Sequence, residues 1–358
     1  MRNWSFLLMA LTVAVAPLSA CSEPGTSTNT SADGQSSNVG GSRLQVVLNR
    51  GRLVCGVEGS IPGFSFLDES GAYSGLDVDV CKAVAAALFD DPDAIEYRRL
   101  DTTERFTALT GGEVDMLSRN TTWTITRDTS VGLEFAPTTF FDGMGMMVRE
   151  DSGITELEDF EGKAICVTSG TATELNLTDQ MRKLDISFEP VVYQNRDATY
   201  AAYDEGRCEG ITSDKSTLIS RRSTLPTPGD HVLMAVTMSK EPLGPVTINN
   251  DSAWFDVVKW VTYGLIQAEE FGITSENVDE FTTSKDPSIK RFLGVEGEGT
   301  LGADMGIPND FMYRAITHVG NYGEIFDRNV GKDSQFKLER GLNDLWTRGG
   351  LMYAPPFR

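Results

Sequence analysis

Residues 120–135 (NTTWTITRDTSVGLEF) gather threonine hydroxyls, an asparagine and a guanidinium directly after the apolar run 114–117. Arg127, in this segment, could hold a carboxylate in bidentate geometry. The run 169–174 (SGTATE) follows an expected strand and opens an expected helix, so its N–H groups could receive an anion. Asp214 ends another expected strand and could accept from an ammonium. Together these groups predict a site for a zwitterion in a desolvated cleft.

Each of these residues has a plainer alternative role. Asp214 could cap the helix expected at 215–222, because aspartate is a preferred N-cap residue. Arg127 could be a surface arginine after a turn. The run 169–174 could hold phosphate, although it lacks the lysine found in phosphate loops.

Motifs of catalysis and metal binding are missing from the sequence. The two histidines, His231 and His318, stand in no GxSxG, HExxH or Cys/His context. The chain has no GxxxxGK[ST] run, and no acidic cluster has metal-loop spacing. We therefore expect no enzyme, no cofactor and no metal. The formal net charge of −21 argues against nucleic acid as a partner.

The elements that must position these groups alternate between strand and helix. A first unit combines expected strands at 52–57, 95–100 and 114–117 with helices at 77–89 and 102–112, and a second unit follows from 156 to 222. This alternation predicts an α/β fold with parallel sheets. Extended segments at 140–150 and 231–239 join the units, which predicts two lobes, a double crossover and a ligand cleft between the lobes.

A mostly helical tail is expected from 251 to 358, with an amphipathic helix at 251–272. We predict lobe 1 from 43–143 and 237–358, including this C-terminal extension, and lobe 2 from 144–236.

The first 20 residues resemble a targeting segment. Arg2 precedes a short apolar run, and the sequence LSAC ends at Cys21, which is typical of a bacterial lipobox. We expect Cys21 to be acylated and to tether the chain to a membrane outside the cytoplasm. An ordinary signal peptide, with Cys21 incidental, is the alternative. Residues 21–42 are rich in Ser, Thr, Gly and Asn and predict a flexible linker.

Four further cysteines remain, Cys55, Cys81, Cys166 and Cys208. Four cysteines in an oxidising compartment allow three disulfide connectivities. We predict Cys55–Cys81 and Cys166–Cys208, because each pair then falls within one lobe. Buried free thiols are the alternative.

The chain resembles the periplasmic amino-acid-binding proteins of ABC transporters (solute-binding protein family 3), and in particular the general L-amino-acid branch. The resemblance rests on LVCGVEGSIPGFSF, RFTALTGGEVDMLSRNTTWTITRD and SGTATELNL, and on GNYGEIFDRNVGK and GLNDLWTRGGLMYAPP in the tail. It covers residues 43–358 and implies the two-lobed type II fold of these proteins, with two hinge crossovers.

The resemblance also implies ligand contacts and partners. Arg127 would bind the ligand carboxylate with Ser169 and Thr171, while Thr122, the carbonyl of Asn120 and Asp214 would accept from the ammonium. Glu58, Ser60 and Phe64 would line the side-chain pocket. Relatives often carry asparagine where Glu58 stands, and the extra carboxylate here could favour basic ligands. We expect a monomer that closes by bending near 143–146 and 236–239 and docks on a membrane permease.

Two other functions stay open at this point. A dehydratase on the same fold, acting on a prephenate-like carboxylate, would need a general acid, and Glu58 is the visible candidate. The other possible function is that of a sensor or receptor module.

Overall fold

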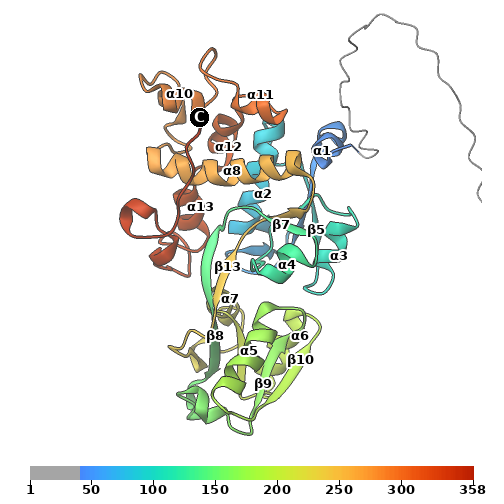
Figure 1. Cartoon of the computed structure of the whole chain (residues 1–358). Coiled ribbons are helices and arrows are strands. Elements are labelled where there is room, and N and C mark those ends of the chain that lie inside the picture. Colours follow the sequence, from blue (N-terminus) through green and yellow to red (C-terminus); the bar gives the residue numbers. More distant parts are fainter. Residues whose placement is uncertain (1–40) are drawn as a thin grey trace, which may run out of the picture. The chain divides into compact units, whose positions relative to one another are not determined.

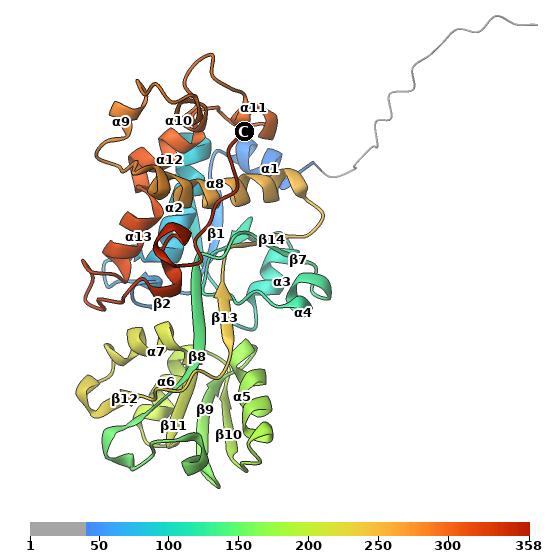
Figure 2. The same ribbon diagram turned by 60° about the vertical axis from the view of Figure 1, so that its left-hand side comes forward.

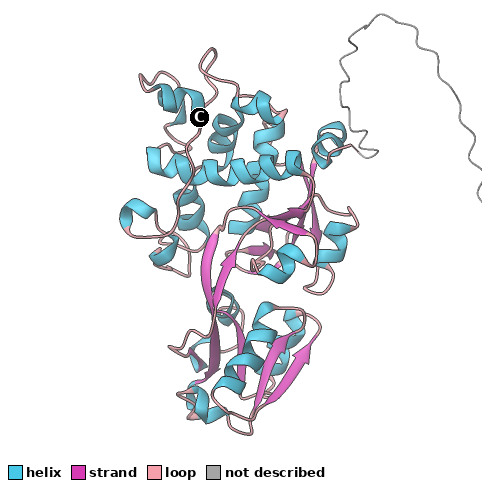
Figure 3. Ribbon diagram, viewed as in Figure 1, coloured by secondary structure: helices cyan, strands magenta, loops and turns pink. Residues whose placement is uncertain are grey.

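The computed structural model describes residues 41–358, so the predictions for residues 1–20 and for Cys21 lie outside the described residues. Its chain forms two α/β lobes, each built on its own mixed sheet (Figures 1 and 3). The sheet of lobe 1 has the strand order β5-β1-β6-β14-β7. Its strands are β1 (Leu53–Val57), β5 (Ile95–Arg99), β6 (Met116–Leu117), β7 (Leu133–Phe135) and β14 (Val246–Ile248).

The sheet of lobe 1 is covered by helices, which bury its interior strand β1. Every residue of β1 is buried, and β1 pairs in parallel with both β5 and β6. Helix α2 (Leu76–Phe89) lies against this strand and is itself buried on nearly all sides. Helices of the C-terminal tail cover the side of α2 that faces away from the sheet, as Figure 2 shows for α8 and α12. The lobe also contains α1 (Arg43–Arg50), α3 (Arg105–Thr110), α4 (Ile125–Thr129) and the small sheet of β2 (Ser60–Ile61), β3 (Ser65–Leu67) and β4 (Tyr73–Ser74).

The helical tail is the predicted C-terminal extension. The apolar stripe of α8 (Ser252–Phe271) is buried as predicted, and Trp254 Nε1 donates to the carbonyl of Asp115 at 2.8 Å. The other tail elements are α9 (Val278–Phe281), α10 (Pro287–Phe292), α11 (Leu301–Met305), α12 (Phe311–Val319), α13 (Tyr322–Asn329), η4 (Gly341–Asn343) and η5 (Trp346–Arg348). Among residues 41–358 no helix has the length and apolarity that crossing a membrane requires.

Lobe 2 repeats the strand–helix alternation on a smaller scale. Its sheet has the order β10-β9-β11-β8-β12, with β9, β10 and β11 parallel and β8 antiparallel to β11. Its strands are β8 (Phe140–Arg149), β9 (Ala164–Thr168), β10 (Glu189–Tyr193), β11 (Gly210–Asp214) and β12 (His231–Leu233). Its helices are α5 (Ala172–Lys183), α6 (Arg196–Asp204) and α7 (Lys215–Arg222), with the short turns η1 (Glu150–Ser152), η2 (Leu157–Phe160) and η3 (Pro228–Asp230).

Two chain segments run between the lobes. The first is β8, whose initial residues pair with β13 (Lys240–Leu243) and whose later residues enter the sheet of lobe 2. The second returns from β12 through residues 234–239 to β13. Of the segment predicted to be extended, 231–239, only the first three residues form a regular strand, β12. Beyond it the N–H groups of Met234 and Met238 still donate to carbonyls of β8, at 2.9 Å each.

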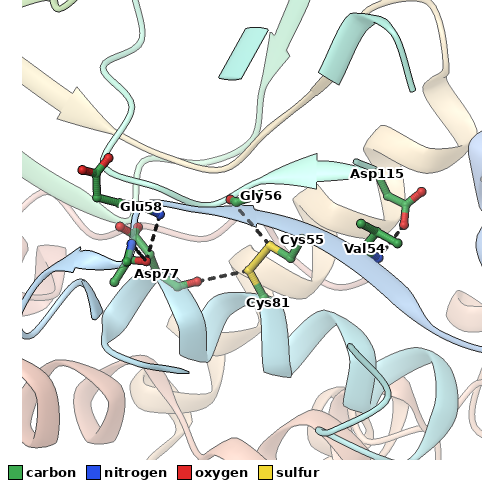
Figure 4. The surroundings of a disulfide bond; sticks show 9 residues. Val54, Cys55, Gly56, Glu58, Asp77, Cys81 and Asp115 are labelled. Carbon is green, nitrogen blue, oxygen red and sulfur yellow. Dashed lines mark hydrogen bonds between the residues drawn. A yellow bond between two sulfur atoms is a disulfide. The ribbon is translucent and has the colours of Figure 1, made fainter. Parts of the chain in front are cut away.

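Both predicted disulfides are present. Cys55 on β1 bonds to Cys81 on α2, and Cys166 on β9 bonds to Cys208 just before β11. The first ties the central strand of lobe 1 to the helix that covers it (Figure 4). The second closes a loop within lobe 2, so each lobe carries its own covalent link.

Some local elements of the structure were not predicted from the sequence. Helix α1, the small sheet β2–β4 and the late start of α3 at Arg105 were not predicted. In the last case the N–H groups of Glu104 and Arg105 bond to the carbonyl of Asp101, so residues 101–104 form a turn before the helix begins.

Candidate functional site

A small polar cavity lies between the lobes. Lobe 1 contributes residues from α3, from the segment after β6 and from α4, while lobe 2 contributes the start of α5, the start of α6 and the end of β11. The lining residues are Arg105, Asn120, Thr122, Arg127, Thr171, Ala172, Thr173, Arg196 and Asp214. The structure therefore brings Asn120, Thr122, Arg127, Thr171 and Asp214, all singled out from the sequence, to one place.

Arg127 reaches the cavity from the short helix α4. The side chain of Thr124 caps this helix by accepting from the N–H of Arg127 at 3.3 Å. The guanidinium donates to the carbonyl of Thr122 at 2.7 Å and, across the lobes, to the carbonyl of Gly170 at 3.5 Å. Burial lowers the pKa of Arg127, while the nearby charges of Glu241 and Asp214 act in the opposite direction. The group is therefore a desolvated cation at the wall of a cavity.

The segment that carries Arg127 is fixed to the second connecting segment. Thr122 pairs with Leu243 in an isolated bridge, and Trp123 donates its N–H to the carbonyl of Pro242 at 2.8 Å. Asn120 adopts a left-handed φ of 52°, a conformation that asparagine tolerates better than most residues. Its side-chain Nδ2 is buried and has no partner within residues 41–358.

Thr171 caps helix α5 at the lobe 2 side of the cavity. Its hydroxyl donates to the carbonyl of Thr168 at 2.7 Å and accepts from the N–H of Glu174 at 3.0 Å. Ala172 and Thr173, in the first turn of α5, line the same cavity, so the positive end of the helix dipole faces it. Ser169 lies outside the lining; its N–H donates to the carbonyl of Tyr193 at 2.8 Å.

Asp214 is the last residue of β11, directly before α7, and it is 6% exposed. In the described chain it makes no capping hydrogen bond to α7, and its Oδ1 has no partner. Burial raises the pKa of Asp214 well above its ordinary value, with further contributions from Asp142 and Glu241, while Arg196 and Arg127 lower it. The capping alternative therefore receives no support, and a buried carboxylate oxygen is available to a cation.

Two further carboxyl groups stand near Asp214 on the connecting strands. Asp142 on β8 lies opposite Glu241 on β13. Burial raises the pKa of Asp142 to about 6, although the N–H groups of Gly143 and Ser216 donate to its oxygens. Glu241 accepts from Asn176 Nδ2 of lobe 2 at 2.8 Å. Acidic groups therefore gather where the chain passes between the lobes.

Glu58, Ser60 and Phe64 do not line this cavity. Glu58 lies after β1 and is 5% exposed; it accepts from Ser60 Oγ at 2.9 Å and is paired with Arg119 and, at 3.4 Å, with Arg196. In Figure 4 its carboxylate points away from α2 and the disulfide. Phe64 belongs to the hydrophobic core of lobe 1, where its ring stands 5.0 Å from that of Phe140.

Three buried arginines at or behind the cavity were not found from the sequence. They are Arg105, which donates to the carbonyl of Gly170 at 3.3 Å, Arg119 and Arg196. Arg196 offered one signal, since it follows the cap Asn195 at the first position of α6. A cation is disfavoured at a helix N-terminus, so an arginine there indicates an anionic partner.

The arrangement can bind a small zwitterion. It presents the buried guanidinium of Arg127 from lobe 1 and the N-terminus of α5 from lobe 2 to an anion, and the buried carboxylate of Asp214 from lobe 2 to a cation. Within residues 41–358 no group of histidine, cysteine and acidic side chains has the arrangement of a metal site. Two α/β lobes joined by two chain segments, with such a cavity between them, define a two-lobed solute-binding protein.

Comparison with known proteins identifies the family. Residues 53–337 match the model of the bacterial extracellular solute-binding proteins, family 3. The general L-amino acid-binding periplasmic protein AapJ of Rhizobium johnstonii is 50% identical over 88% of this chain and 92% of its own length. The glutamate/glutamine/aspartate/asparagine-binding protein BztA of Rhodobacter capsulatus is 45% identical over 88% of this chain and 94% of its own.

A solved structure supports the same assignment. A periplasmic binding protein of an ABC transporter from Brucella ovis, with glutathione bound, is 46% identical and superposes with a TM-score of 0.87, covering 89% of this chain and all of that one. The chain belongs to the bacterial extracellular solute-binding proteins, family 3. This is a family of solute-binding proteins and not of enzymes, and Glu58, held between two guanidiniums, is not placed as the general acid that a dehydratase requires.

Proposed function

We propose that this protein captures free L-amino acids outside the cytoplasm and delivers them to the permease of an ABC transporter. The observation that carries this proposal is that Arg127 and Asp214, each buried and each on a different lobe, line one cavity. Arg127 and the first N–H groups of α5 bind the α-carboxylate, and Asp214 with the oxygens of Thr122 and Asn120 binds the α-ammonium. The names of AapJ and BztA, which are 50% and 45% identical to this chain, support amino acids as the ligand class.

Capture proceeds by closure of the lobes around the ligand. Contacts that cross the lobes support a closed form: Arg99 pairs with Asp197 at 2.8 Å, and Arg221 donates to the carbonyl of Ser60 at 2.8 Å. Bending occurs near 143–146 and 236–239, between lobe 1 (43–143 and 237–358) and lobe 2 (144–236). Gly143 and Gly145 lie in this stretch, where a Cβ would come within 2.5 Å of Thr237 and 2.7 Å of Lys215. Closure removes water from the charged ends of the ligand and so strengthens both ion pairs.

A screen of L-amino acids against the purified chain tests this proposal. Because a ligand that binds only the folded state stabilises it, we expect several polar L-amino acids at millimolar concentration to raise the melting temperature by several degrees. Isothermal titration then gives the affinities, and the D-enantiomers serve as matched controls. If no L-amino acid raises the melting temperature, the proposal is wrong. Conversion of prephenate or arogenate to an aromatic product would instead favour the dehydratase alternative.

We propose that the chain works as a monomer tethered through an acylated Cys21. The sequence LSAC at 18–21 and the polar linker that follows it support this tether. In a bacterial host, metabolic labelling with a fatty acid should mark the wild-type chain and not Cys21→Ser. Equal labelling of the two, or a soluble wild-type chain without lipid, would contradict the anchor. Light scattering of the chain from residue 22 onward should give the mass of one subunit.

A further inference from the structure

A buried group of three charges joins the two lobes beside the cavity. Glu58 and Arg119 belong to lobe 1, and Arg196 belongs to lobe 2. Their exposed fractions are 5%, 0% and 3%. Glu58 contacts both guanidiniums, so the ion pair between Glu58 and Arg196 forms only when the lobes meet.

The charges in this group do not balance. Two guanidiniums share one carboxylate, and Asp214, the carboxylate that lines the cavity beside Arg196, is taken by the ligand ammonium. The group therefore keeps a surplus of one positive charge in a buried site that water screens poorly. Arg119 is buried completely, and its Nε and Nη1 have no hydrogen-bond partner in the described part of the chain. Burial, together with repulsion from Arg196 and Arg127, lowers the pKa of Arg119 well below its ordinary value. The surplus charge therefore costs free energy that an anion could recover.

Arg196 is the member of this group that lines the ligand cavity, so its positive charge faces a bound ligand. It lines the cavity, donates to Ser213 Oγ at 3.1 Å and lies 3.4 Å from Glu58. Arg127 and Asp214 line the same small cavity as Arg196, so the side chain of a ligand whose charged ends they hold lies within reach of the Arg196 guanidinium.

We propose that Glu58 and Arg196 determine ligand specificity by setting the charge that the ligand's side chain meets. This inference rests on the proposed function. The site prefers amino acids whose side chains end in a carboxylate or carboxamide, and it rejects cationic side chains. Glu58 neutralises one of the two guanidiniums and so allows neutral amides to bind beside acids. This reverses the expectation from the sequence that Glu58 favours basic ligands, because its carboxylate is already engaged by two arginines.

Glutamate and glutamine, which have nearly the same shape and differ in charge, test this role. Titration calorimetry would give the dissociation constants of both ligands for the wild type and for Glu58→Gln. Removing the carboxylate leaves both guanidiniums uncompensated, so the ratio of the two affinities should shift toward glutamate by at least about tenfold. Glu96→Gln is the matched control, since Glu96 is an exposed glutamate of lobe 1 paired with Arg52 at 3.2 Å, and it should leave the ratio unchanged.

An unchanged ratio in Glu58→Gln, or a shift toward glutamine, would overturn the inference. If that variant does not fold, the affinities of the wild type for lysine and methionine test the inference instead. Lysine should bind at least about a hundredfold more weakly than methionine, which has a similar length and no charge. Lysine binding as tightly as methionine would overturn the inference. Failure of every amino acid to bind would instead overturn the proposed function.

Discussion

Replacement of Arg127 by alanine is expected to abolish amino-acid binding. The α-carboxylate of a bound ligand would remain in a desolvated cavity without its guanidinium partner. Removing one partner of a buried ion pair costs about 3–5 kcal/mol, so the dissociation constant should rise by roughly a hundredfold to several thousandfold. Titration calorimetry and the ligand-induced rise in melting temperature both measure this loss.

Two further variants separate the role of Arg127 from general effects of charge. Arg182→Ala removes an exposed arginine of lobe 2 that pairs with Asp179, and it should bind ligands as the wild type does. Arg127→Lys keeps the positive charge but loses the planar guanidinium that can donate two parallel hydrogen bonds to a carboxylate. Its affinity for the ligand should therefore lie between those of Arg127→Ala and the wild type. Wild-type affinity in a folded Arg127→Ala variant would rule out Arg127 as the carboxylate partner.

Asp214→Asn should weaken binding by about a hundredfold, because the ligand ammonium would lose its charged acceptor in a buried site. The exchange of carboxylate for carboxamide preserves the shape of the residue, and Asp214 makes no capping bond in the described chain that the variant would break. The variant should therefore fold with a melting temperature close to that of the wild type. Asp179→Asn, at an exposed aspartate of the same lobe, is the control.

The pH dependence of binding gives a second measure of Asp214. Without a ligand cation, burial and the neighbouring carboxyl groups raise the pKa of Asp214 well above 3.8. A bound ammonium favours the ionised form and lowers this pKa, so affinity is greatest above the ligand-free pKa and is lost as the pH falls through it. The loss should therefore begin at a higher pH than an ordinary aspartate would give.

In Asp214→Asn this decline of affinity with falling pH should be much shallower. Dissociation constants measured from about pH 8 to about pH 5 in both chains would show the difference. An equally steep decline in the variant would assign the titration to another group, such as Asp142, whose pKa is raised by burial to about 6.

Much of the fold followed from patterns that are local in the sequence. The stripe containing Trp254, Val258 and Leu265 predicted the buried face of α8, and the alternation of strands and helices predicted both lobes. Arg127, Thr171 and Asp214 each follow or end a strand, so their convergence at one cavity followed from the geometry of parallel sheets.

The features that were missed depend on contacts between distant residues. The pairing of Glu58 with Arg196 joins residues 138 positions apart on different lobes, and no local pattern reports it. Phe64 follows the same strand as Glu58, yet packing against Phe140 takes it into the core and away from the cavity. Proximity in sequence to a predicted site residue was therefore a poor guide to proximity in space.

The C-terminal extension bears on how the lobes move. The side-chain amide of Asn343 accepts from the N–H of Phe141 at 2.6 Å and donates to its carbonyl at 3.2 Å, as a neighbouring strand would. Tyr322 likewise donates to the carbonyl of Thr139 at 2.8 Å. These contacts hold the lobe 1 end of β8 from outside the sheet, so the bend that we propose between the lobes would begin beyond Phe141. A bend confined to a few peptide units would bring the residues of the two lobes that line the cavity back to the same relative positions at each closure.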